Sequence, residues 1–190
     1  TLTDPSSNPI AGTGSWSASA GNKWLYSWKP SADLTAVGNY TVSFTGVKDL
    51  AGNVATTLSG NLVVDRAKPT FGAKDPSGLV YVDTDMPAIS VKVKDAGKAG
   101  LDLDVKDMWV SGVGTVTGPV YSGPDLEDYY TLTWTPTTSI GQGVKTVRVR
   151  AVDKAGNEAT ETWEFTVDSE PPTLALTSPA LVTVGADKYI

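Results

Sequence analysis

The string Asp-x-Ala-Gly-Asn occurs twice in the chain, and its spacing constrains the fold more than any other feature. It reads DLAGN from Asp49 and DKAGN from Asp153. Other landmarks return in the same order: WKP at Trp28 recurs as WTP at Trp134, and VVDRAKPTF recurs as TVDSEPPTL. A period of about 103 residues matches one small domain, so the sequence predicts a tandem repeat.

Apolar and polar residues alternate within each repeat, which is typical of β-strands with one buried face. Ile89, Val91 and Val93, for example, are separated by serine and lysine. Helical spacing of apolar residues does not persist for more than a turn or two, so the chain is predicted to be all-β. For the complete repeat we predict strands near residues 79–82, 88–94, 108–116, 119–122, 129–134, 144–152 and 162–167.

Three aromatic residues of the first repeat, Trp24, Tyr26 and Trp28, occupy the positions that residues 130–134 hold in the second. Their alternation predicts that they point into the core. The chain has six tryptophans, and those that do not belong to the core would suit stacking on sugar rings. A carbohydrate-binding accessory module of a secreted enzyme is therefore an alternative function.

The composition argues against several classes of protein. The net charge of −6 argues against nucleic acid as a partner, because binding to phosphates needs clustered lysine and arginine. The chain has no cysteine and no histidine, which removes thiolate metal sites and the commonest general base. Acidic clusters such as LDLDVKD from Leu101 do not single out a catalytic pair. We therefore expect no enzyme activity, no required cofactor and no membrane insertion.

The strings VKDLAGN and AVDKAGN, with the VVDRAKPTF and TVDSEPPTL that follow them, resemble the bacterial Ig-like repeats of large cell-surface and biofilm adhesins. The resemblance covers nearly the whole chain. It implies cysteine-free, Greek-key immunoglobulin-like β-sandwiches in an extracellular protein, serving as a structural spacer or a cell-adhesion element with a glycan or host-surface ligand possible. An S-layer-type lattice protein is a further alternative. One departure is Lys145, which stands where the first repeat has Tyr40.

The register of the repeats sets the expected domains. Residues 1–66 would form a partial first repeat without its N-terminal strands, residues 67–168 a complete repeat, and residues 169–190 the first strand of a third, as in a segment of a longer protein. The partial repeat would leave a sheet edge uncovered. We expect the strand around Leu181–Val184, from another molecule or from the same chain folding back, to add to this edge. Alternatively, the first repeat closes with fewer strands.

Loops and a linker are expected to meet where the two repeats join. The strand topology brings the loop after residue 152 to the same end of the domain as the linker and the loop after residue 94. Ca²⁺ takes about six to eight oxygen ligands, so an interdomain calcium site is one interpretation. The other is a simple turn, because Asp and Asn bond their own backbone and glycine supplies a positive φ. The candidate ligands are Asp65, Asp95, Asp153 and Asn157.

Overall fold

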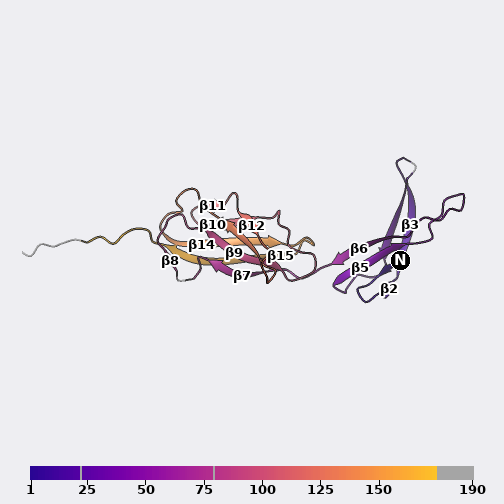
Figure 1. Ribbon diagram of the computed structural model, residues 1–190, viewed down its shortest axis with the longest axis horizontal. Coiled ribbons are helices and arrows are strands. Elements are labelled where there is room, and N and C mark those ends of the chain that lie inside the picture. Colours follow the sequence, from indigo (N-terminus) through magenta and orange to yellow (C-terminus); the bar gives the residue numbers. More distant parts are fainter. Residues whose placement is uncertain (22, 79, 175–190) are drawn as a thin grey trace, which may run out of the picture.

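The computed structural model describes residues 1–21, 23–78 and 80–174, and in this part of the chain the protein is all-β. Two groups of strands lie end to end along the long axis of the molecule (Figure 1). We call residues 1–64 the first unit and residues 69–168 the second unit. No helix that could span a membrane occurs among the described residues.

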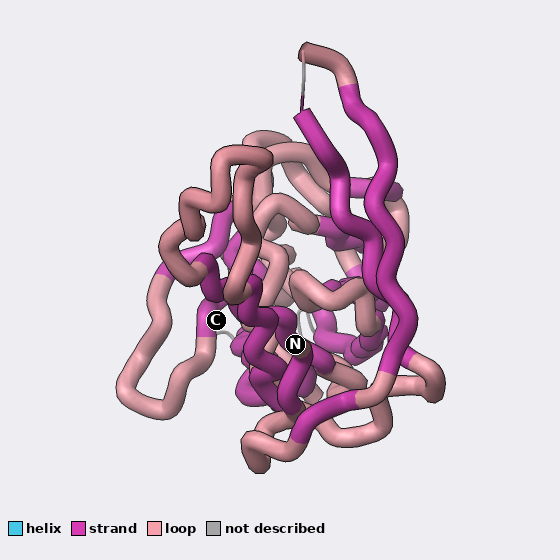
Figure 2. Tube along the Cα trace, turned by 90° about the vertical axis from the view of Figure 1, so that its right-hand side faces the viewer, coloured by secondary structure: helices cyan, strands magenta, loops and turns pink. Residues whose placement is uncertain are grey.

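The first unit contains one four-stranded antiparallel sheet and one hairpin. The sheet has the order β2-β1-β5-β6, and the hairpin pairs β3 with β4 over eight residues of each strand. This hairpin projects beyond the rest of the molecule when the structure is viewed along the long axis (Figure 2). The bounds are β1 (Leu2–Thr3), β2 (Pro9–Ile10), β3 (Gly12–Ser19), β4 (Lys23–Pro30), β5 (Gly38–Phe44) and β6 (Leu58–Val64).

The second unit contains two sheets. One has the order β11-β10-β14-β15-β8 and the other the order β12-β13-β9-β7. All pairings are antiparallel except that of β8 with β15. The bounds are β7 (Pro69–Asp75), β8 (Tyr81–Val82), β9 (Ile89–Asp95), β10 (Asp107–Val110), β11 (Gly114–Thr115), β12 (Val120–Ser122), β13 (Tyr130–Trp134), β14 (Gly143–Val152) and β15 (Glu158–Val167).

The core of the second unit lies between these two sheets. Alternate residues of β9 are completely buried, and so are Met108 of β10 and Val147 of β14. They form one cluster that draws side chains from both sheets, as expected where two half-apolar sheets cover each other. The alternation predicted for Ile89, Val91 and Val93 is therefore confirmed.

The first unit has a much smaller core. Leu2 and Tyr40 are the buried hydrophobic side chains among its described residues, and the Tyr40 hydroxyl donates a 2.9 Å hydrogen bond to the Ala36 carbonyl. The prediction that Trp24 belongs to the core is wrong, because its side chain is 67% exposed. In the described residues β4 pairs only with β3, so no strand on the other side of β4 covers Trp24.

Some predicted strands differ in the structure. The strand predicted at residues 108–116 is divided into β10 and β11 by a turn at Gly112, whose φ is 81°. The sequence does not predict β7, because the strand begins at Pro69, Pro76 follows it and Gly72 interrupts its alternation. Residues 169–174 form no strand, and the rest of the predicted third repeat, with Leu181–Val184, lies outside the described residues.

The packing between the sheets predicts a large cost for shortening Ile89. Ile89→Ala removes a completely buried side chain from the interface and should lower the free energy of unfolding of the second unit by about 2–5 kcal/mol. Val144→Ala, at a side chain of β14 that is 62% exposed, should change it by less than about 0.5 kcal/mol. Urea denaturation followed by tryptophan fluorescence measures both, and equal losses would contradict the assigned core.

Candidate functional site

Three carboxylates meet where the first unit joins the second. Asp65 follows β6, Asp95 ends β9 and Asp153 follows β14. One oxygen of each lies within 4.8 Å of the other two. The structure thus brings together Asp65, Asp95 and Asp153, although they are far apart in the sequence, as their places in the strand order predict. We call these three residues the junction cluster.

Asp153 is held by the loop that it begins. Its Oδ1 accepts hydrogen bonds from the backbone N–H groups of Ala155 at 2.9 Å and Asn157 at 2.8 Å. Its Oδ2 accepts a 2.7 Å bond from Nδ2 of Asn157. With 1% of its surface exposed, Asp153 is nearly withdrawn from water, and these donors replace its lost hydration.

Asp65 is bound by backbone donors on both sides of the junction. Its Oδ1 accepts from Ala67 N–H at 3.0 Å, and its Oδ2 accepts from the N–H groups of Lys98 and, at 2.6 Å, Ala99. Burial acts to raise the pKa of Asp65, but the N–H donors of Ala99, Ala67 and Lys98 outweigh it and hold the pKa below its ordinary value. Asp65 is therefore an anion at neutral pH.

Asp95 organises the loop that closes over Asp65. Its Oδ1 accepts from Gly97 N–H at 2.8 Å and its Oδ2 from Gly100 N–H at 2.6 Å. The Asp65 carboxylate lies directly against the Cα of Gly97, where a Cβ would collide with it. Only glycine at position 97 allows the loop and the carboxylate to approach this closely.

Asn157 braces the cluster through its amide nitrogen. Besides the bond to Asp153, Nδ2 donates to the backbone carbonyl of Asp65 at 3.3 Å. The side chain therefore ties the loop of the second unit to the linker. Its Nδ2, a donor, faces Asp153, so in this arrangement Asn157 positions the carboxylate, and its role as a cation ligand stays a prediction.

Among the described residues, no ion pair with a basic side chain balances the charge of the junction cluster. The ion pairs of the described residues join Lys74 to Glu161, Lys92 to Asp125, and Arg150 to Asp107 and Glu158, and none of them reaches the cluster. Carboxylates this close repel one another, most strongly where burial limits screening by water. A divalent cation would relieve this repulsion, and carboxylate oxygens are the ligands that Ca²⁺ prefers.

The first copy of the motif forms the same turn without the cluster. Asp49 Oδ1 accepts from Ala51 and Asn53 N–H, both at 2.9 Å, and Asn53 Nδ2 donates to Asp49 Oδ2 at 2.7 Å. Gly52 and Gly156 both have the positive φ that this turn needs, 92° and 89°. The turn interpretation is thus confirmed for both copies, but the Asp49 loop is exposed.

Two further loops form the same turn, in which an aspartate side chain binds backbone N–H groups of its own loop, and the sequence analysis did not predict them. Asp4 binds the N–H groups of Ser6 and Asn8 with one oxygen, and Asp125 binds those of Glu127 and Tyr129. Neither contains the Ala-Gly-Asn letters. What these loops share with the motif is a positive φ three residues after the aspartate, at Ser7 and Asp128, and the sequence does not show it because no single residue type encodes it.

A second candidate site lies on the outer face of β10 and β14. The guanidinium carbon of Arg148 is 5.6 Å from the Trp109 ring centroid, and Arg150 pairs with Asp107 at 3.0 Å. These four residues and Thr160 line a shallow cavity of about 220 Å³. An aromatic ring flanked by charged donors and acceptors is a surface that sugars can use. Of these residues, only Trp109 is of the type, a tryptophan, that the sequence analysis considered for sugar binding.

No known family model matches the chain, and no curated protein matches it.

The close approach of Gly97 to Asp65 gives a direct test of the junction geometry. Gly97→Ala places a Cβ against the Asp65 carboxylate, so the carboxylate must move away from its Lys98 and Ala99 donors. We expect hydrogen exchange at the Lys98 and Ala99 amides to accelerate by at least about tenfold, which is about 1.4 kcal/mol of lost protection.

Gly60→Ala is the matched control. Gly60 lies in β6 with open space around it, so an added methyl group meets no atom. Amide exchange at Lys98 and Ala99 should be unchanged in this variant. Unaltered exchange in Gly97→Ala as well would show that Asp65 does not depend on the close approach.

Proposed function

We propose that the chain is a run of tandem immunoglobulin-like β-sandwich repeats from a bacterial surface or secreted multi-domain protein, acting as a non-catalytic spacer or adhesion element. The support lies in the order of the strands. Sheet β2-β1-β5-β6 follows the order of β11-β10-β14-β15, and the β3–β4 hairpin corresponds to β12–β13. The end-to-end arrangement of the two units suits a protein that spans distance (Figure 1).

The observation that carries the proposal is the junction cluster. The linker between β6 and β7 is short and contributes Asp65, while Asp95 and Asp153 come from the second unit. Arg66 also binds the Leu34 carbonyl at 2.8 Å, which holds the same linker against the first unit. A Ca²⁺ ion bound by the three carboxylates would fix the linker to the second unit and so limit bending between the repeats.

Calcium dependence of thermal stability tests this function. If Ca²⁺ binds only the folded junction, a Ca²⁺ concentration of about 100 times the Kd adds about 2.7 kcal/mol to the free energy of unfolding. This raises the Tm of a unit of this size on the order of 10 °C. Differential scanning calorimetry with millimolar Ca²⁺ against chelator should show this shift. An unchanged Tm would overturn the calcium-stiffened junction.

Two variants with the same chemical change distinguish Ca²⁺ binding by the junction cluster from an effect of the aspartate-led turn. Asp153→Asn removes a charge from the junction cluster, whereas Asp49→Asn makes the same change in the matching turn that lacks the cluster. The Ca²⁺-induced shift should disappear in Asp153→Asn and persist in Asp49→Asn. If both variants lose the shift, or neither does, Ca²⁺ does not bind at the junction.

Carbohydrate binding is the second candidate function, favoured by the cavity beside Trp109 and Arg148. A sugar ring stacked on Trp109 should change tryptophan fluorescence, and Trp109→Ala should abolish the change and weaken binding by at least about tenfold, which is about 1.4 kcal/mol. Trp16→Ala, at an exposed tryptophan of the first unit, is the control. A glycan array on which the protein binds no sugar would rule this candidate out.

A further inference from the structure

The outer face of the five-stranded sheet carries an arginine whose charge is not matched by an acid. Among the described residues Arg148 forms no ion pair, and its side chain is exposed. Its neighbours in register, Trp109 of β10 and Thr162 of β15, are uncharged. The guanidinium lies over the Trp109 ring, 5.6 Å from the ring centroid. A guanidinium in this position keeps its N–H donors at its rim, where a ligand can reach them.

The acids on this face already have partners of their own. Arg150, two residues further along β14, binds Asp107 through Nε at 3.0 Å and Glu158 through Nη1 at 3.2 Å. Glu164 of β15 accepts a 3.0 Å hydrogen bond from the Thr146 hydroxyl. The cation that a ligand meets beside the tryptophan is therefore the stacked guanidinium.

The cavity at this face combines a planar cation with groups that bind hydroxyls. Thr160 offers a hydroxyl and Asp107 offers carboxylate oxygens to its volume of about 220 Å³. An arginine binds a carboxylate through two parallel N–H···O bonds, and such charge-assisted bonds are about twice as strong as neutral ones. A sugar with a carboxylate satisfies both kinds of group at once, whereas a neutral sugar leaves the charge of Arg148 without a partner.

The charge around the cavity limits how much negative charge a ligand can bring. Arg150 is matched by Asp107 and Glu158, and the whole chain has a net charge of −6. A densely charged polyanion such as a nucleic acid would meet repulsion here, because it needs many cations to replace its counterions. A single carboxylate on one sugar needs only the guanidinium of Arg148.

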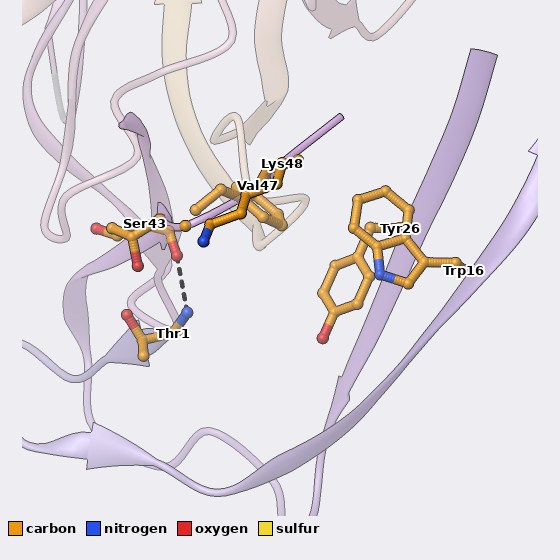
Figure 3. Close-up of a pocket in the computed structure, with 9 residues that line it drawn as sticks. Thr1, Trp16, Tyr26, Ser43, Val47 and Lys48 are labelled. Atoms are coloured by element: carbon orange, nitrogen blue, oxygen red, sulfur yellow. Dashed lines mark hydrogen bonds between the residues drawn. The ribbon is translucent and has the colours of Figure 1, made fainter. Parts of the chain in front are cut away.

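A cleft of the first unit shows aromatic rings without this combination. Trp16 and Tyr26 lie on one side of this cleft, which has a volume of about 590 Å³ (Figure 3). Their ring centroids are 4.9 Å apart, so the two rings pack against each other. The described lining of the cleft includes Lys48 and no arginine. A lysine ammonium is a point charge without the planar fork that matches a carboxylate, so Trp16 is a suitable control for Trp109.

We propose that the outer face around Trp109 and Arg148 binds a sugar that carries a carboxylate, such as a uronic or sialic acid within an oligosaccharide. The Arg148 guanidinium binds the carboxylate, and the sugar ring contacts the indole of Trp109 beside it. Thr160 and Asp107 bind hydroxyl groups of the sugar. This inference rests on the carbohydrate binding proposed above as the second function, and it names the class of sugar.

Trisaccharides with a single carboxylate test this inference. We expect the protein to bind at least one of three, which carry glucuronic, galacturonic or sialic acid, and to bind its methyl ester at least about tenfold more weakly. The ester keeps the sugar ring and its hydroxyls but has no negative charge. Calorimetric titration in the presence of chelator measures both dissociation constants without any contribution from calcium. Raising NaCl to about 0.5 M should weaken binding of the acid and leave that of the ester nearly unchanged.

Variants of Arg148 show which group recognises the carboxylate. Arg148→Gln should weaken binding of the acid by at least about tenfold and leave binding of the ester unchanged, which also shows that the variant is folded. Arg148→Lys keeps the charge without the fork, so its affinity for the acid should lie between the two. Arg66→Gln makes the same change of charge in the linker and should bind like the wild type. Trp109→Ala should weaken binding of both the acid and the ester, and Trp16→Ala of neither.

The outcomes separate recognition of the carboxylate from carbohydrate binding itself. Equal affinity for the acid and its ester, lost in Trp109→Ala, would leave a sugar site at this face and overturn the role of the carboxylate. Equal affinity of Arg148→Gln and the wild type for the acid would overturn the assignment of Arg148. If none of the three trisaccharides binds in either form, the second function and this inference are both wrong.

Discussion

The sheets in the described part of this protein are apolar on one face, and such a face is stable in water only where another layer covers it. In the second unit two sheets of four and five strands cover each other, and Ile89, Met108 and Val147 lose all contact with solvent. In the first unit a four-stranded sheet faces a hairpin of two strands. The same strand pattern thus yields a filled core in one unit and open clefts in the other.

The aspartate-led turns show how one local structure acquires different roles. The side chains of Asp49 and Asp153 make the same hydrogen bonds to their loops, so the local sequence is enough to form the turn. Only Asp153 also lies beside Asp65 and Asp95. A possible ion site therefore depends on the strand order that brings two more loops to the same end of the unit, and the motif by itself does not define it.

Much of the second unit could be predicted from the sequence. Where two complete sheets cover each other, the apolar residues of an alternating strand are the buried ones, so the alternation of apolar and polar residues predicts burial. That Asp65, Asp95 and Asp153 lie close together could be predicted from the alternating directions of successive strands, which place their loops at the same end of the unit. The sequence was less informative where backbone geometry determines whether a segment forms a strand. β7 contains Gly72 and a shift in its pairing register after Phe71, so its pattern is broken. Trp24 looked like a core residue because alternation cannot tell whether a covering strand is present.

The parallel contact between β8 and β15 has a mechanical consequence. Val80 and Val82 carbonyls accept the N–H groups of Thr166 and Asp168 at 3.1 and 2.9 Å, next to the point where the chain leaves the unit. Tension applied between the linker at Asp65 and the exit at Asp168 draws these two strands in opposite directions along their length. The bonds are then loaded in shear and must break together, whereas an antiparallel hairpin pulled from its open end would unzip one bond at a time.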